Sequence, residues 1–227
     1  MEVIHGNIFT TKCQTIVNTV NCFGVMGAGI ALECKYRYPE MNERYVELCQ
    51  QKLLNIGQLY LYKSSKKWIL NFPTKHHWKF PTKKEYLEKG LKKFVDTYQE
   101  RGIESIAFPL LGASHGGMTK DDSLEIMERY LRKISIPYEV YSYNPNTPDD
   151  LFPIFKAFML DNDSKKIRNL TDLTNKQVDV LLKAIRNNQV NNMNSFELIK
   201  GIGEKAIQKC FTFAMSKEIQ NIQSKLF

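Results

Sequence analysis

The chain has 227 residues, of which 43% are hydrophobic and 25% charged, and its formal net charge is +8 at neutral pH. This length allows one full domain and a smaller second one, and the composition is that of a globular protein. The apolar runs are far too short to span a membrane, residues 1–6 do not resemble a signal peptide, and the five cysteines lack metal-site spacing. We therefore expect a cytoplasmic protein with reduced thiols.

The first part of the chain alternates strand-like and helix-like segments. Short apolar runs predict strands at 2–4, 15–19, 59–62, 68–72, 105–108 and 139–143. Helical spacing of apolar residues predicts helices at 28–38, 40–50, 84–101 and 120–133. This alternation is typical of an α/β sandwich with a mixed, largely parallel sheet.

Two glycine-rich loops follow predicted strands: a first loop at 22–29 and a second loop at 112–117. Glycine lets the backbone approach a ligand closely, and main-chain N–H groups in such a loop bind anions. Each loop alone is equally compatible with simple chain reversal. The pair, at the carboxyl ends of strands, indicates a diphosphate ligand. Cys22 lies in the first loop, where we interpret it as a small turn residue and not a nucleophile, because no acid–base partner is evident.

Residues 63–84 carry seven lysines and no acidic residue, together with aromatic and histidine side chains. Lysines neutralise phosphates and aromatic faces stack on unpaired bases, so this mixture suits single-stranded nucleic acid. The alternative is a solvated basic loop with two of the aromatic side chains in the core. From this stretch we select four candidate DNA-binding residues, His76, His77, Trp78 and Lys79.

Prolines and small polar residues at 144–150 mark a domain boundary, which we place after residue 146. The second domain, 147–227, shows helical patterns at 151–160, 174–188, 195–200 and 204–224, and residues 151–227 carry a net charge of +5. Residues 196–207 resemble a helix–hairpin–helix motif, whose glycines, here Gly201 and Gly203, let main-chain N–H groups meet a DNA phosphate. The alternative is a tight turn within a helical module that binds a protein.

Residues 1–145 resemble the macrodomain family of ADP-ribose binders and hydrolases. The resemblance rests on Gly-Asn-Ile at 6–8, Val-Asn-Thr-Val-Asn at 17–21, Asn-Phe-Pro-Thr-Lys at 71–75, and Pro-Leu-Leu-Gly at 109–112 with the loops that follow. It implies a three-layer α/β/α sandwich, to which this chain adds a small C-terminal all-helical domain. Within the family the chain looks closest to DarG-type antitoxins, which remove the ADP-ribose that the partner toxin DarT attaches to bases of single-stranded DNA.

The resemblance also implies roles for individual residues. Lys75 and Asn21 would be the catalytic residues, and Asn21 would face the distal ribose. ADP-ribose would be bound by Asn7, Ile8, Thr19, Gly24, Val25, Met26, Gly27, Gly29, Pro109, Gly112, Ser114, His115, Gly116, Gly117, Met118 and Tyr143. Asn7 stands where macrodomains usually carry the Asp that accepts from the adenine amino group, and its side-chain carbonyl can still accept one hydrogen bond. The second loop lacks the catalytic Asp of a related macrodomain group, so catalysis would depend on Lys75, with His115 in a supporting role.

The sequence therefore predicts an ADP-ribosyl glycohydrolase that acts on a nucleobase, thymidine foremost, of single-stranded DNA. The expected partners are ADP-ribose, ADP-ribosylated single-stranded DNA and a DarT-type toxin, and we expect a monomer that needs no cofactor or metal. A protein ADP-ribose hydrolase, an ADP-ribose-phosphate phosphatase and a non-catalytic ADP-ribose reader are the alternatives. Lys75 can act as an ammonium acid or as a neutral amine nucleophile, and the residues do not choose between the two.

Overall fold

The computed structural model describes residues 2–216 and 219. The chain forms two compact units, Met1–Tyr143 and Asn144–Phe227. The division lies three residues before the boundary expected from the prolines, because the last strand of the first unit ends at Tyr143. Among the described residues, no helix has the length and apolar character needed to cross a bilayer.

Within the described residues, the first unit contains one six-stranded sheet of order β1-β6-β5-β2-β4-β3. Its strands are β1 (Ile4–Gly6), β2 (Thr15–Asn21), β3 (Tyr60–Lys63), β4 (Trp68–Lys75), β5 (Ile106–Pro109) and β6 (Tyr138–Tyr143). Every neighbouring pair is parallel except β3 with β4. The expected mixed, largely parallel sheet is confirmed.

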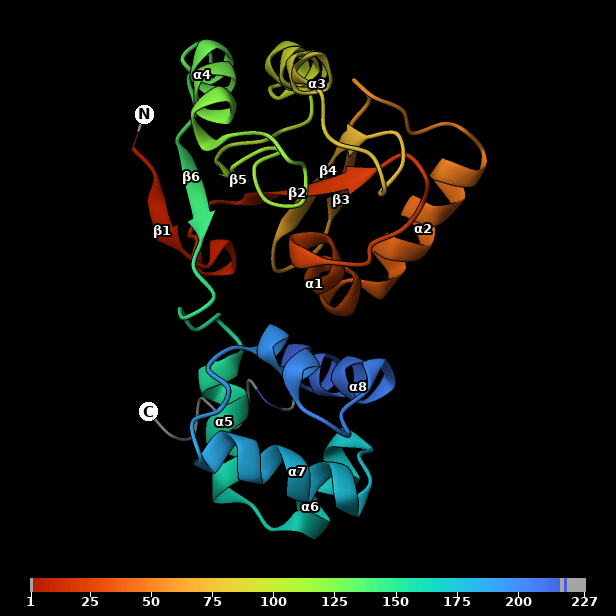
Figure 1. Ribbon diagram of the computed structural model, residues 1–227, viewed down its shortest axis with the longest axis vertical. Coiled ribbons are helices and arrows are strands. Elements are labelled where there is room, and N and C mark those ends of the chain that lie inside the picture. Colours follow the sequence, from red (N-terminus) through yellow and green to blue (C-terminus); the bar gives the residue numbers. More distant parts are fainter. Residues whose placement is uncertain (1, 217–218, 220–227) are drawn as a thin grey trace. The chain divides into compact units, whose positions relative to one another are not determined.

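Helices cover both faces of this sheet. Helices α3 (Lys84–Thr97) and α4 (Lys120–Leu131) lie on one face, and α1 (Gly29–Arg37) and α2 (Pro39–Gln50) lie on the other (Figure 1). The core beneath α3 and α4 is fully buried and includes Phe72, Phe94 and Phe108. Gly90 of α3 packs directly on the Phe72 ring, which leaves no room for a larger residue there. The predicted three-layer α/β/α sandwich is confirmed.

Strand β4 runs three residues beyond its predicted end, through Pro73 to Lys75. Proline is expected to end a strand because it cannot donate a ladder hydrogen bond. Here β3 pairs with β4 only as far as Asn71, so beyond that residue β4 has β2 as its single neighbour. The missing N–H of Pro73 is tolerated because that side of β4 carries no partner strand. The extension is what brings Lys75 into the sheet.

The described residues of the second unit form helices joined by turns and loops, without strands, as predicted. Its elements are α5 (Phe152–Asp161), α6 (Ser164–Thr171), α7 (Asn175–Arg186), the 3₁₀ helix η2 (Met193–Leu198) and α8 (Glu204–Met215). Their apolar faces enclose a core rich in phenylalanine, including Phe155, Phe158 and Phe196.

One helix of this unit was not predicted, and two of the helix predictions need comment. Helix α6 was not predicted, because it is short and only two of its eight residues, Ile167 and Leu170, are hydrophobic. The helix predicted at 195–200 is the 3₁₀ helix η2, shifted towards the N-terminus by two residues. Of the helix predicted at 204–224, residues 217–218 and 220–224 lie outside the described part of the chain.

Candidate functional site

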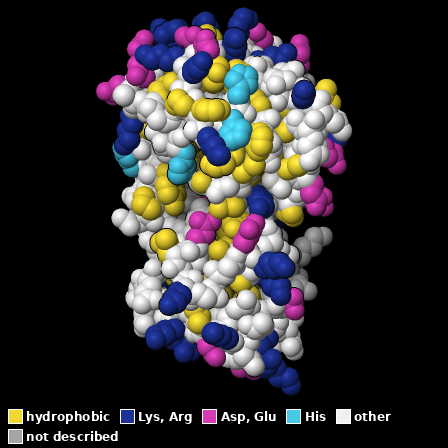
Figure 2. Space-filling model, turned by 45° about the vertical axis from the view of Figure 1, so that its right-hand side comes forward, with side chains coloured by type: hydrophobic (Ala, Val, Ile, Leu, Met, Phe, Trp, Pro, Cys, Tyr) yellow, Lys and Arg dark blue, Asp and Glu magenta, His cyan; other side chains and the backbone are white. Residues whose placement is uncertain are grey.

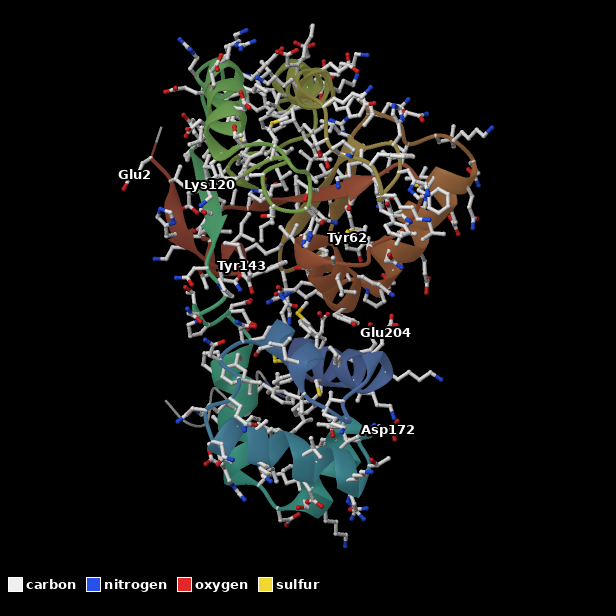
Figure 3. The ribbon with its side chains drawn as sticks, in the orientation of Figure 1. Glu2, Tyr62, Lys120, Tyr143, Asp172 and Glu204 are labelled. Carbon is white, nitrogen blue, oxygen red and sulfur yellow. The ribbon has the colours of Figure 1, made fainter. Side chains whose placement is uncertain are left out.

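The predicted site residues gather at one edge of the sheet. Asn21 ends β2, Lys75 ends β4, Pro109 ends β5 and Tyr143 ends β6 (Figure 3), while Asn7 follows the end of β1. These strands are mutually parallel, so their carboxyl ends meet at the same edge. Ligands of α/β proteins bind at such an edge.

Asn21 shapes the first loop through its side-chain amide. Its Oδ1 accepts hydrogen bonds from the main-chain N–H groups of Phe23 (3.0 Å) and Val25 (3.3 Å), and its Nδ2 donates to the Val25 carbonyl (2.6 Å). The buried Tyr45 hydroxyl donates to the Asn21 carbonyl at 2.7 Å, and burial raises the Tyr45 pKa, which keeps the hydroxyl protonated. The structure thus makes Asn21 an organiser of the loop, and its catalytic role stays a prediction.

The first loop leads directly into the N-terminus of α1. Ala28 is the N-cap residue and supplies no side-chain hydrogen bond to the helix, and Gly29 has a φ of 56°. An N-terminus without a side-chain cap leaves main-chain N–H groups for a ligand, and the helix dipole favours an anion there. Burial raises the pKa of the nearby Cys22 thiol to about 11, so this thiol is neutral at physiological pH and is a poor nucleophile.

The second loop folds tightly on itself. A Cβ atom on Gly116 would lie 2.2 Å from the Gly112 carbonyl oxygen, so position 116 accepts no other residue without rearrangement. The Met118 N–H donates to the Gly112 carbonyl at 3.0 Å, and the Thr82 N–H donates to the Gly116 carbonyl at 2.9 Å. The loop therefore exposes Ser114, His115 and Gly117 from a fixed backbone.

Lys75 and His115 bring the two loops together. The Lys75 ammonium donates a hydrogen bond to the main-chain carbonyl of His115 in the second loop. The His115 ring in turn lies against the first loop, because a Cβ on Gly29 would be 3.3 Å from its Cδ2 atom. Burial lowers the pKa of Lys75 below its usual value of 10.5. A half-buried amine thus stands where both candidate anion-binding loops converge.

The remaining predicted ligand-binding residues surround this point with different exposures. Asn7 is buried, and its Oδ1 accepts from the Phe9 N–H at 2.9 Å, capping the short 3₁₀ helix η1 (Ile8–Thr10). Ile8 and Met26 are buried as well, whereas Thr19 and Met118 are half-buried. Tyr143 is 54% exposed at the end of β6. Asn7 is therefore already engaged through one lone pair of its carbonyl oxygen, and a ligand would use the other.

The basic stretch at 63–84 divides into a structural part and an exposed part. Phe72 is fully buried, and Trp68 is half-buried beneath the Lys63 ammonium, which lies 4.1 Å from its ring centroid. The rings of His77, Trp78 and Phe80 instead form a surface cluster, and Phe23 from the first loop joins it. His76 packs against Tyr86 of α3 at a centroid distance of 5.0 Å. The sequence pattern did not single out Phe23, because it lies far from this stretch along the chain.

The second unit contains two similar hairpins. In the first, Asp172 has a left-handed backbone, Leu173 is buried and Thr174 caps α7 with its side chain. In the second, Gly201 has a φ of 95°, Ile202 is buried and Gly203 begins α8 without a side-chain cap. A Cβ on Gly201 or Gly203 would meet no atom within 4 Å. The second hairpin thus presents open backbone, as its predicted role requires.

Among the described residues, no group of three or more His, Cys, Asp and Glu side chains is placed to hold a metal ion.

Comparison with known proteins identifies the fold. The macro domain family matches residues 17–127. The macrodomain of Thermus aquaticus DarG is 36% identical, with a TM-score of 0.59, and the match covers 62% of this chain and 96% of that structure. The macrodomain of Mycobacterium tuberculosis DarG is 34% identical, with a TM-score of 0.58, over 62% of this chain and 98% of that structure. The chain belongs to the macrodomain family.

Curated relatives of this macrodomain carry more specific names. A protein of Thermus aquaticus named DNA ADP-ribosyl glycohydrolase is 36% identical over 149 residues, which are 64% of this chain. A Thermosipho africanus protein named as a fusion of DNA ADP-ribosyl transferase and DNA ADP-ribosyl glycohydrolase is 34% identical over 62% of this chain. The match spans 41% of the length of each relative. The helical second unit lies largely beyond the matched region.

Proposed function

We propose that this macrodomain removes ADP-ribose from a nucleobase, thymidine foremost, of single-stranded DNA, and that it is the antitoxin of a DarT-type DNA ADP-ribosyltransferase. The names of its curated relatives support the reaction. The fusion of transferase and glycohydrolase in Thermosipho africanus supports the partnership. We further propose that it acts as a cytoplasmic monomer.

One observation carries the catalytic proposal: the convergence of both loops on Lys75. The ammonium contacts the second loop through the His115 carbonyl, and the His115 ring contacts Gly29 at the end of the first loop. A diphosphate held by main-chain N–H groups of the loops would place the distal ribose beside Lys75. Such positioning supplies a large part of the acceleration in enzymes. A reader of ADP-ribose would not need an amine at this point.

The reaction is hydrolysis of an N-glycosidic bond. The bond between the anomeric carbon of the distal ribose and the base nitrogen breaks, the base leaves with a proton, and the hydroxyl of water is finally attached to the anomeric carbon. The transition state develops oxocarbenium character. Lys75 contributes either by donating the proton as an ammonium or by attacking the sugar as a neutral amine before water releases it. The lowered pKa of Lys75 increases its neutral fraction, as the amine route requires, and it also makes the ammonium a stronger acid.

DNA would reach the protein through two surfaces. In the first unit, the four residues 76–79 follow Lys75 directly, and the Lys79 ammonium lies 5.1 Å from the Trp78 ring centroid. In the second unit, the open hairpin at Gly201 and Gly203 would meet a phosphate without reading sequence. The positive charge of residues 151–227 supports nucleic acid over a toxin as the partner of that hairpin.

The deciding experiment uses a single-stranded oligonucleotide that carries ADP-ribose on thymidine. Its mass is followed after addition of the wild-type protein or of Lys75→Ala, and binding of free ADP-ribose to both proteins is measured by calorimetry. Loss of the ADP-ribose mass with the wild type alone, with ADP-ribose binding retained in the variant, is the expected result. Tight binding of ADP-ribose without hydrolysis by either protein would overturn the proposal, and conjugates of guanosine and of protein would then be compared.

A further inference from the structure

The most unusual surface of the first unit is a cluster of four rings, the exposed Phe23, Trp78 and Phe80 and the half-buried His77, which we call the aromatic cluster. His77 lies at its centre, with ring centroids 4.3 Å from Phe23, 5.4 Å from Trp78 and 5.7 Å from Phe80. Phe23 is 58%, Trp78 50% and Phe80 63% exposed. Figure 2 shows exposed hydrophobic and histidine side chains side by side on this unit, with Lys and Arg side chains among them.

Folding does not account for this cluster. Three large apolar rings that stay half or more in water contribute little to the core, and a contiguous exposed apolar patch usually marks a binding surface. The rings also come from two segments, the first loop and the stretch after β4. Tertiary folding, and not adjacency in the sequence alone, therefore brings them together. A ligand with flat apolar faces would cover the surface that these rings leave in water.

The position of the cluster ties it to the candidate catalytic residue. Asn21 and Lys75 are paired in the register of β2 and β4, and Phe23 and His77 each follow two residues later. Both segments therefore carry their rings outward from the same edge of the sheet. His76, between Lys75 and His77, packs against Tyr86 of α3 and does not join the cluster.

The charge around the cluster indicates the class of ligand. The Lys79 ammonium lies 5.1 Å from the Trp78 ring centroid, and residues 63–84 contain no acidic side chain. Aromatic faces bordered by lysines fit a base and its phosphate, because every base offers a π-face and each linkage carries a negative charge. A base within a duplex has its faces covered by its neighbours, so only unpaired bases can use such a surface.

We propose that the aromatic cluster is a stacking subsite for the unpaired base that neighbours the modified nucleotide. This inference rests on the proposed function, because it assumes that the modified nucleotide is bound beside Lys75. It extends that function by assigning the selection for longer, single-stranded substrates to a surface formed by Phe23 of the first loop and the rings that follow β4. The protein then selects single-stranded oligonucleotides over an isolated modified nucleoside and over a duplex.

The test compares two substrates of the 227-residue chain: ADP-ribosylated thymidine and a short single strand that contains it. The double variant Trp78→Ala/Phe80→Ala removes two rings, and Leu53→Ala, which alters a 57% exposed residue of the same unit, is the matched control. We expect the wild type and the control to prefer the oligonucleotide in kcat/KM. In the double variant the ratio of kcat/KM values, oligonucleotide over nucleoside, should fall about tenfold or more, as expected when base–aromatic stacking is lost.

Two further comparisons separate the possible outcomes. Trp78→Phe should retain most of the ratio of kcat/KM values, because it keeps an aromatic face at this position without changing charge. A duplex of the same sequence should be a poor substrate. An unchanged ratio in the double variant, with hydrolysis intact, would overturn the subsite and leave the proposed function standing. If the wild type hydrolyses neither substrate, the proposed function fails, and binding of the unmodified single strand by fluorescence anisotropy becomes the readout. Retention of that binding by the double variant would then overturn the subsite as well.

Discussion

Asn21 and Lys75 are partners across neighbouring parallel strands because an irregularity in β4 leaves Thr74 without a partner in β2. Val20 pairs with Pro73, and the next residue, Asn21, pairs with Lys75. The Thr74 hydroxyl bonds back to the Val20 carbonyl at 3.4 Å. Such bulges redirect side chains beside functional sites. Here the bulge places Asn21, which organises the first loop, opposite Lys75, whose ammonium contacts the second loop.

Removal of the Lys75 amine should abolish most of the hydrolysis and spare the fold. For Lys75→Ala and for Lys75→Arg we expect single-turnover hydrolysis of the ADP-ribosylated oligonucleotide to fall by about 10²–10⁴-fold, the range for a lost acid, base or nucleophile. Arg keeps the positive charge but does not provide a neutral amine, so it should fail if amine attack operates. Lys133→Ala is the control, because the Lys133 ammonium lies outside the site and over the Tyr130 ring. Full activity of Lys75→Arg would exclude amine attack.

The pH dependence of the reaction should follow the lowered pKa of Lys75. Because burial moves this pKa below 10.5, the neutral amine forms at lower pH than on an ordinary lysine. If the amine attacks, the single-turnover rate rises with pH and levels off above the lowered pKa, and we expect this profile. An ammonium acid would give the opposite sign, with a rate that is level at low pH and falls as pH rises through the pKa. Single-turnover rates measured at a series of alkaline pH values distinguish a rate that rises with pH from one that falls.

The placement of the site was predictable from sequence, but its internal contacts were not. Glycine loops after apolar strands indicate the carboxyl edge of a parallel sheet, and this reasoning placed both loops at one edge, whereas Lys75 was selected only through the family resemblance. The bulge at Thr74 leaves no mark in the hydrophobic pattern, so the pairing of Asn21 with Lys75 was not foreseeable. Phe23 joins the aromatic cluster by tertiary folding alone. In each case a contact between distant segments decided the geometry, and residue periodicity carries no information about such contacts.

Gly116→Ala should disable ADP-ribose binding while the first unit stays folded. The added methyl group would lie 2.2 Å from the Gly112 carbonyl oxygen, and the two backbone segments of the second loop would have to separate. The fixed N–H groups of the loop would lose their arrangement, and we expect the affinity for ADP-ribose by calorimetry to fall tenfold or more, about 1.4 kcal/mol. Gly203→Ala in the second unit, where a Cβ meets no atom within 4 Å, is the control. Wild-type affinity in Gly116→Ala would show that the loop does not hold the ligand.

Gly90→Ala should destabilise the first unit although alanine is the better helix former. A Cβ at this position of α3 would lie 2.2 Å from Cζ and 2.5 Å from Cε1 of the fully buried Phe72 ring. Overpacking of this kind costs about 1–3 kcal/mol, which exceeds the gain in helix propensity of about 1 kcal/mol. The free energy of unfolding in urea measures the difference. Phe72→Leu in the Gly90→Ala background should recover part of the loss, whereas additive effects of the two substitutions would argue against the clash.

Charge reversal beside the second hairpin should weaken DNA binding more than the same change beside the first. Lys205 and Lys176 occupy equivalent places, each two residues after the N-cap of its helix, Gly203 or Thr174. Only the Gly203 hairpin lacks a side-chain cap and leaves its backbone open, whereas the Lys209 ammonium pairs with Asp172 in the other. For Lys205→Glu we expect weaker binding of an unmodified oligonucleotide and a salt slope reduced by about one, the loss of one phosphate contact. Lys176→Glu is the matched control and should change little. Equal effects of the two substitutions, or no salt-dependent binding by the second unit at all, would favour a toxin as the partner of this surface.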